Sequence, residues 1–125
     1  MGLMRALVID DSRAMRSILT GILEEIGFEV EQAKDAEDAL SLLEKDEDFE
    51  LALVDWNLPQ MSGLDLVKTI RTMADLESLR LMMVTTETQL ARVREALTAG
   101  ADEYIMKPFD KEMLLEKLTL LGIDG

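Results

Sequence analysis

Polar side chains that could take part in a reaction or bind a ligand follow directly after short apolar runs of the sequence. They are Asp10, Asp11, Asp55, Thr85 and Lys107. The runs before them show little polar alternation, which is typical of strands buried on both faces of a parallel sheet. Because the carboxyl ends of parallel strands share one edge, where ligands bind, we expect these side chains to meet on a single rim.

Three carboxylates on one rim predict a cation. Carboxylates repel one another by about 1–4 kcal/mol per pair at 4 Å, depending on the effective dielectric. Oxygen-only ligands supplemented by water suit Mg²⁺ better than zinc or copper. The ion would neutralise an incoming phosphate, and a carboxylate can attack phosphorus to give an acyl phosphate. Lys107 would add a positive charge and Thr85 a hydrogen-bond donor.

Each of these residues also has a simpler structural explanation. Asp11 or Ser12 can cap a helix, and an aspartate after a strand, such as Asp55, often forms a turn. Thr85 can simply end a strand, Lys107 can belong to a turn, and Trp56 is more typical of packing. The combination of such features at four strand ends favours the functional interpretation.

The elements that must position these groups alternate between strands and helices. Strands are expected at 6–9, 28–31, 51–54, 81–84 and 104–106, and the alternating pattern of 28–31 is typical of an edge strand. Helical periodicity predicts a helix over 15–26 ended by Gly27, and one over 90–97 ended by Gly100. Asp35, Ser62 and Asp110 are expected to cap the other three. The pattern predicts an α/β fold, a doubly wound parallel sheet with right-handed crossovers and five helices, in one domain.

Composition excludes several classes of function. Cysteine and histidine are absent, which removes thiol chemistry, catalytic triads and histidine-ligated zinc. The formal net charge of −13 disfavours nucleic-acid binding and favours divalent cations and basic partners. No apolar run approaches the ~18 residues of a membrane span, and no signal peptide is present, so we expect no membrane association and a cytoplasmic location.

Residues 5–121 carry a set of motifs that match a known family. The motifs are VIDDS at 8–12, VDWNLPQMSG at 54–63, VTTE at 84–87 and YIMKPF at 104–109. In this combination and order, the chain resembles the receiver domains of two-component response regulators, most closely the stand-alone chemotaxis type. The resemblance implies the strand order 2-1-3-4-5 and a single receiver domain over 1–125 without an effector domain.

The resemblance also implies roles at the acidic rim. Asp55 would be the phosphoacceptor. Asp11, Asp55 and the backbone carbonyl of Asn57 would ligate Mg²⁺, while Asp10 would hold a metal-bound water.

Further roles follow from the same resemblance. Lys107 would bind the phosphoryl group, with a cis bond to Pro108. Thr85 would move toward the phosphate and Tyr104 would turn inward behind it.

Residues beside the acceptor would tune the lifetime of the acyl phosphate. Asn57 and Glu87 flank the acceptor and match the chemotaxis type. Thr86 departs from the smaller residue of many receivers and would slow access to the site.

The implied partners are a sensor histidine kinase as phosphodonor and a downstream target or phosphatase. The signal would leave through the fourth helix, fifth strand and fifth helix of a monomer that catalyses only its own phosphorylation and slow autodephosphorylation. The expected fourth helix carries Arg92 and Arg94 but no lysine, so a flagellar motor target is not assured.

Three alternatives stay open from the sequence. A phosphohydrolase of the haloacid dehalogenase type would place a second aspartate where Asn57 stands. A flavin binder would need a phosphate loop where Asp10 and Asp11 repel phosphate. The third alternative is a receiver fold that acts as an unphosphorylated docking module.

Overall fold

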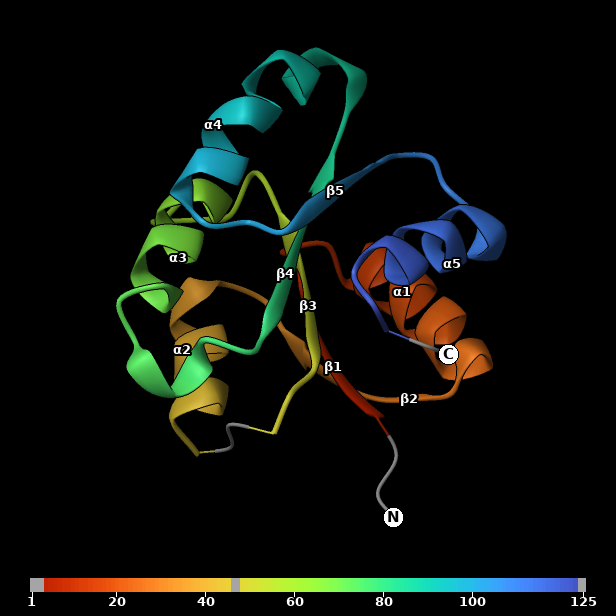
Figure 1. Ribbon diagram of the computed structural model, residues 1–125, viewed down its shortest axis with the longest axis horizontal. Coiled ribbons are helices and arrows are strands. Elements are labelled where there is room, and N and C mark those ends of the chain that lie inside the picture. Colours follow the sequence, from red (N-terminus) through yellow and green to blue (C-terminus); the bar gives the residue numbers. More distant parts are fainter. Residues whose placement is uncertain (1–3, 46–47, 124–125) are drawn as a thin grey trace.

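The computed structural model describes residues 4–45 and 48–123. Within this part, one parallel sheet has the strand order β2-β1-β3-β4-β5 and is covered by helices on both sides (Figure 1). The strands are β1 Met4–Ile9, β2 Phe28–Ala33, β3 Leu51–Asp55, β4 Arg80–Thr85 and β5 Glu103–Met106. The helices are α1 Arg13–Ile26, α2 Ala36–Lys45, α3 Gly63–Ile70, α4 Val93–Ala99 and α5 Lys111–Leu120, with 3₁₀ turns at Ala74–Leu76 and Glu87–Arg92. The predicted fold class, strand order and edge position of β2 are confirmed.

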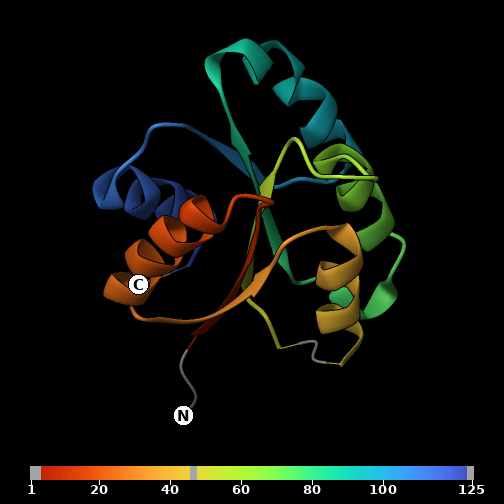
Figure 2. The ribbon, with the colours of Figure 1, turned by 180° about the vertical axis from the view of Figure 1, so that it is seen from behind.

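The two faces of the sheet bury separate clusters of apolar side chains. Helices α1 and α5 lie on one face, and α2, α3 and α4 lie on the other (Figures 1 and 2). Successive residues of a strand point to opposite faces, so Val8 packs with α1 and α5 while Leu7 and Ile9 pack with the three other helices. Burial on both faces explains why the central strands are apolar without alternation.

The pairing register brings the ends of β1 and β3 side by side. Ile9 pairs with Val54, and Asp55 pairs with Val84 on the next strand. Asp10 and Asp55 each come directly after one residue of the Ile9–Val54 pair, so they lie close together although they are 45 positions apart in the chain. The parallel register is thus the element that gathers the carboxylates.

Side-chain caps start four of the helices, as the sequence predicted. The Ser12, Asp35, Ser62 and Asp110 side chains each accept a hydrogen bond from the backbone N–H three residues further on. These bonds satisfy amide groups that lack a partner within the helix. Ser12 rather than Asp11 caps α1, which leaves the Asp11 carboxylate available for other chemistry.

The fourth helical region differs from the prediction. Its first part, Glu87–Arg92, is wound as a 3₁₀ turn, and α4 proper begins only at Val93. Three residues per turn shift the phase of the apolar pattern, so Val93 and Ala96 face the core while Leu90 and Leu97 are exposed. The apolar period at these two leucines therefore marks surface and not core.

A half-buried arginine ties together the loops at the opposite end of the sheet from Asp55. The Arg71 guanidinium donates to the carbonyls of Leu76, Leu79 and Gly100 at 3.0, 2.7 and 2.9 Å. It also donates to the Asp102 carboxylate at 2.8 Å. Because the Gly100 carbonyl lies just beyond α4, Arg71 anchors the carboxyl end of that helix to α3.

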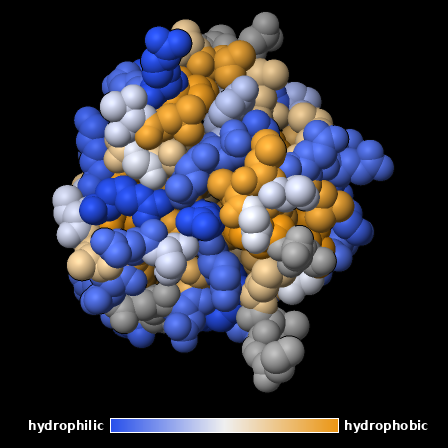
Figure 3. All heavy atoms as spheres, viewed as in Figure 1, coloured by the Kyte–Doolittle hydropathy of each residue, from blue (hydrophilic) through white to orange (hydrophobic). Residues whose placement is uncertain are grey.

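The face drawn in Figure 3 is mostly hydrophilic, with smaller apolar areas between the charged side chains. This agrees with a composition of 31% charged residues. No helix in the described ranges combines the length and the apolar character that crossing a bilayer requires.

Two glycines offer a matched test of backbone packing. An added Cβ at Gly63, the first residue of α3, would clash with the Asp55 carbonyl oxygen and lie 3.1 Å from Trp56 Cα. Gly21 in α1 has no heavy atom within 4 Å of the same position. We expect Gly63→Ala to lower the free energy of unfolding by about 1–3 kcal/mol and Gly21→Ala to raise it by about 1 kcal/mol.

Urea unfolding followed by circular dichroism measures both changes. Equal effects of the two substitutions would contradict a close approach of α3 to the acceptor strand.

Candidate functional site

Three carboxylates from two strand ends converge at the carboxyl edge of the sheet. One oxygen each from Asp10, Asp11 and Asp55 lies within 4.8 Å of the others. Asp10 is 1% and Asp55 8% exposed, whereas Asp11 faces solvent. A buried pair with an exposed third member leaves one open side, through which a cation or a phosphoryl group can approach.

The Asp10 carboxylate has one satisfied and one unsatisfied oxygen. Its Oδ1 accepts a hydrogen bond from the Ser12 N–H at 2.9 Å. Its Oδ2 is buried and has no hydrogen-bond partner among the described residues. A buried carboxylate oxygen without a hydrogen bond is costly, so Asp10 Oδ2 is suited to a cation or to a water bound to one.

Lys107 places one ammonium between two carboxylates. Its Nζ lies 3.4 Å from Asp55 Oδ1 and 3.5 Å from Asp10 Oδ2. The backbone holds this lysine in place, because the Lys107 N–H donates to the Thr85 carbonyl at 2.7 Å, and the bond to Pro108 is cis, as the resemblance implied. The distances are long for charged hydrogen bonds, so the ammonium is shared by both partners.

The electrostatics of the site disfavour the ionised form of the Asp55 carboxyl. Burial raises the pKa of the Asp55 carboxyl above its ordinary value, and the negative charge of Asp10 raises it further. Lys107 lowers the same pKa but does not cancel the other two effects. One ammonium therefore does not compensate the carboxylate cluster.

The donor set fits a hard divalent cation. The acidic side chains that meet here offer carboxylate oxygens, of which Asp10 Oδ2 accepts no hydrogen bond, and thiolate and imidazole ligands are excluded because the chain has neither cysteine nor histidine. Such a set is typical of Mg²⁺ sites that use few protein ligands and several waters. The Asp10, Asp11 and Asp55 cluster is thus compatible with the predicted metal.

The predicted switch residues occupy definite positions around this cluster. Thr85 ends β4 and is fully buried, and its hydroxyl donates to the Thr86 carbonyl at 3.2 Å. Tyr104 is half-buried on β5, with the Lys117 ammonium of α5 4.0 Å from the centre of its ring. Lys117 also pairs with Glu103 at 3.1 Å. In this state neither Thr85 nor Tyr104 donates to Asp55.

The structure describes the side chains of two of the three predicted tuning residues. Asn57 is exposed two residues after Asp55. Thr86 is half-buried, and its N–H donates to the Gln89 side chain at 3.2 Å. The side chain of Glu87 lies outside what the structure describes. The roles assigned to Asn57, Thr86 and Glu87 stay predictions.

Sequence reasoning did not predict the contacts that two arginines make with Trp56 and Asp10. The Arg92 guanidinium lies over the ring of Trp56 at 5.0 Å, and Trp56 is 2% exposed, which confirms its packing role. Arg16 donates to the backbone carbonyl of Asp10 at 2.8 Å. The targets of these long side chains are a ring face and a carbonyl, which leave no spacing pattern in the sequence.

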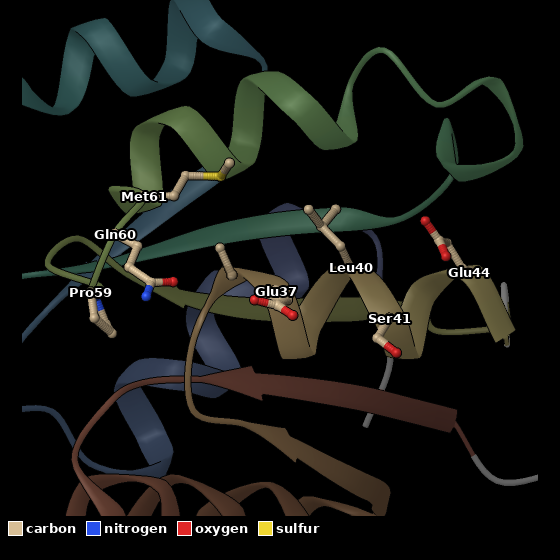
Figure 4. A pocket seen from close by; sticks show the side chains of 8 residues that line it. Glu37, Leu40, Ser41, Glu44, Pro59, Gln60 and Met61 are labelled. Carbon is tan, nitrogen blue, oxygen red and sulfur yellow. The ribbon is translucent and has the colours of Figure 1, made fainter.

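A groove of about 410 Å³ lies between α2 and the loop before α3 (Figure 4). Leu40 and Met61 supply apolar lining, and Glu37 and Glu44 are acidic. In the same loop Gln60 has φ 71°, and the Met61 N–H donates to the Pro59 carbonyl at 2.7 Å, forming a tight turn. None of the carboxylates of the cluster lines this groove, so it takes no part in the chemistry of Asp55.

The sheet and the acidic rim together define a doubly wound α/β protein with a cation-compatible carboxylate site. Residues 6–119 match the family described as response regulator receiver domain. The chain therefore belongs to the response regulator receiver family, and with it to two-component signalling, as a phosphoacceptor. The resemblance seen in the sequence is confirmed.

Individual relatives agree with this assignment. The chain is 44% identical over 116 residues to a chemotaxis protein CheY homolog of Campylobacter jejuni, covering 92% of this chain and 89% of that protein. It is 40% identical over 119 residues to chemotaxis protein CheY1 of Helicobacter pylori, covering 94% and 96%. The solved structure of chemotaxis protein CheY4 of Vibrio cholerae superposes with a TM-score of 0.87 at 33% identity, covering 95% and 98%.

The raised pKa of Asp55 predicts how stability depends on pH. Since the folded pKa lies above the unfolded one, ionised Asp55 destabilises the fold, and this cost disappears as pH falls through that window. With chelator at neutral pH, we expect Asp55→Asn to unfold at a temperature about 4 °C higher, equivalent to about 1 kcal/mol. The gain should shrink as pH is lowered toward the ordinary range of aspartate.

Thermal melts over a pH series test this expectation. Asp65→Asn is the control, because Asp65 is an exposed carboxylate on α3 without a side-chain partner among the described residues. A lower melting temperature for Asp55→Asn at every pH would show that the cluster is not under electrostatic strain.

Proposed function

We propose that Asp55 accepts a phosphoryl group from a phosphohistidine of a sensor kinase, with Mg²⁺ held by Asp11, Asp55 and the backbone carbonyl of Asn57. One observation carries this proposal: three carboxylates lie within 4.8 Å while an ammonium stands 3.4 Å from Asp55. The absence of histidine agrees with a chain that receives the phosphoryl group and does not generate it.

The chemistry is in-line phosphoryl transfer. An Asp55 carboxylate oxygen attacks phosphorus as the bond from phosphorus to the histidine nitrogen breaks, and the imidazole leaves. Lys107 neutralises the charge on the phosphoryl oxygens, and Asp10 orients a water at the metal site. When bound, Mg²⁺ supplies further positive charge for the same oxygens. Catalysis is limited to this chain's own modification, with no outside substrate.

The new charge is read by residues that lead into the adjoining elements. Phosphorylation adds about −1.5 to −2 charge and three acceptor oxygens, which draw in the Thr85 hydroxyl and the Lys107 ammonium. Tyr104 of β5 turns inward as Lys107, the residue after that strand, responds. Thr86 and Glu87, with Asn57, set how quickly water reaches the acyl phosphate.

The output surface consists of α4, β5 and α5. These elements carry exposed apolar side chains, namely Leu97, Met106 and Met113, which are suited to a protein partner. The partner is a downstream target or a phosphatase, and the receiver works as a monomer. We assign it to chemotaxis because relatives named for chemotaxis match over most of their own length. The signal then passes to a separate protein.

Intact-mass measurement after incubation with acetyl phosphate and Mg²⁺ tests the acceptor. We expect a gain of one phosphoryl group in the wild type, none in Asp55→Asn, and none in the wild type with chelator. The Asp65→Asn control should be modified normally. Modification of Asp55→Asn would show that another residue is the acceptor, and steady phosphate release from small phosphoesters would point to a hydrolase.

Lys107 is expected to separate modification from output. Lys107→Ala removes the ammonium that links Asp55 to β5. We expect the variant to be phosphorylated about 10-fold more slowly, because the ammonium no longer neutralises the phosphoryl oxygens. Phosphorylation should then leave the conformation of α4 and α5 unchanged. Amide chemical shifts of α4, β5 and α5 before and after phosphorylation provide the measurement. The exposed Lys111→Ala is the control. Shift changes of wild-type size in Lys107→Ala would refute the link.

A further inference from the structure

The backbone carbonyl of Asp10 is held by an arginine from the helix that follows it. Asp10 lies just beyond β1, and its N–H donates to the Ala33 carbonyl of β2 at 3.1 Å. Its carbonyl accepts from Arg16 Nη1 at 2.8 Å. Both polar groups of the Asp10 backbone are therefore fixed, one by the sheet and one by α1.

Arg16 is itself braced by the neighbouring edge strand. Its Nε donates to the Gln32 side-chain oxygen at 3.2 Å, and the Gln32 amide donates to the Thr20 hydroxyl at 2.9 Å. The planar guanidinium thus uses two edges at once, one on Asp10 and one on β2. A lysine has a single donor group and does not reproduce this arrangement.

The bond from Arg16 fixes the peptide plane between Asp10 and Asp11. Rotation about the Cα–C bond of Asp10 would break the 2.8 Å bond and move the Cα of Asp11. Asp11 is exposed and belongs to the carboxylate cluster, so its direction depends on this plane more than on packing. The neighbouring Asp10 is held by burial and by Ser12 as well.

We propose that Arg16 is a positioning residue of the metal site, which presets the Asp10–Asp11 peptide so that the Asp11 carboxylate meets a divalent cation in binding geometry. The inference rests on the proposed function of Asp55 and its Mg²⁺. Partners behind the direct ligands of a metal typically change its affinity by about 10–100-fold when they are removed. Arg16 contributes through its hydrogen bond and not through its charge.

The charge of Arg16 and its hydrogen bond predict opposite changes in Mg²⁺ affinity when the residue is replaced. Arg16 is a cation near a carboxylate cluster, so its removal by electrostatics alone would strengthen Mg²⁺ binding. Loss of a positioning bond would weaken it. Arg13 is the matched control: it lies on the same helix, carries the same charge, is exposed, and has no side-chain partner among the described residues.

The experiment is a Mg²⁺ titration followed by the fluorescence of Trp56, the single tryptophan and the residue after Asp55. We expect Arg16→Met to bind Mg²⁺ about 10-fold more weakly than the wild type, and Arg13→Met to bind equally or more tightly. Arg16→Lys, which keeps the charge, should also bind more weakly.

Gln32→Leu is a second test variant. It removes the hydrogen bond between Gln32 and Arg16 but leaves Arg16 and the rest of α1 unchanged. We expect it to weaken Mg²⁺ binding several-fold, and it can be measured even if Arg16→Met does not fold. Unchanged or tighter Mg²⁺ binding by folded Arg16→Met, or wild-type affinity in Gln32→Leu where Arg16→Met is unfolded, would overturn the inference alone. A wild type without a saturable Mg²⁺ response would overturn the proposed function with it.

Discussion

Two buried carboxylates repel each other and share one ammonium, and the chemistry of the site depends on this interaction. Asp10 and Asp55 lie at the ends of neighbouring strands, and Lys107 stands about equally far from both, at 3.5 and 3.4 Å. Burial raises the pKa of the Asp55 carboxyl, the charge of Asp10 raises it further, and the single lysine does not offset these two effects. A protein that retains such an arrangement stores a preference for additional positive charge, which is the basis of both metal binding and phosphoryl transfer.

The fold around this cluster brings residues that are distant in the sequence to the carboxyl edge of the sheet. The parallel register of β1, β3, β4 and β5 does this without requiring contacts between the residues along the chain. Close approach of α3 at Gly63 then sets the loop after Asp55, and the helix caps fix where each helix begins. The chemistry therefore rests on backbone geometry first and on side-chain choice second.

The sequence was sufficient for the strands, the caps and the convergence of the carboxylates, because apolar runs, capping residues and parallel strand ends obey local rules. It was insufficient where the outcome depends on winding or on rotamers. Leu90 and Leu97 have helical spacing, yet the 3₁₀ turn before α4 places them at the surface. The shared position of Lys107 and the contact of Arg16 with a carbonyl depend on how long side chains extend in space.

The anchoring of α4 by Arg71 has a mechanical consequence. The guanidinium donates to the Gly100 carbonyl, just past the end of α4 that lies far from Asp55, and to two carbonyls of the connection between α3 and β4. A rod secured at one end pivots, and its displacement grows with distance from the pivot. When α4 tilts about its anchored carboxyl end, the displacement is therefore greatest at its amino end. There the Arg92 guanidinium lies over the ring of Trp56, the residue after Asp55. A structural change next to Asp55 therefore acts on the end of α4 that is farthest from the anchored end.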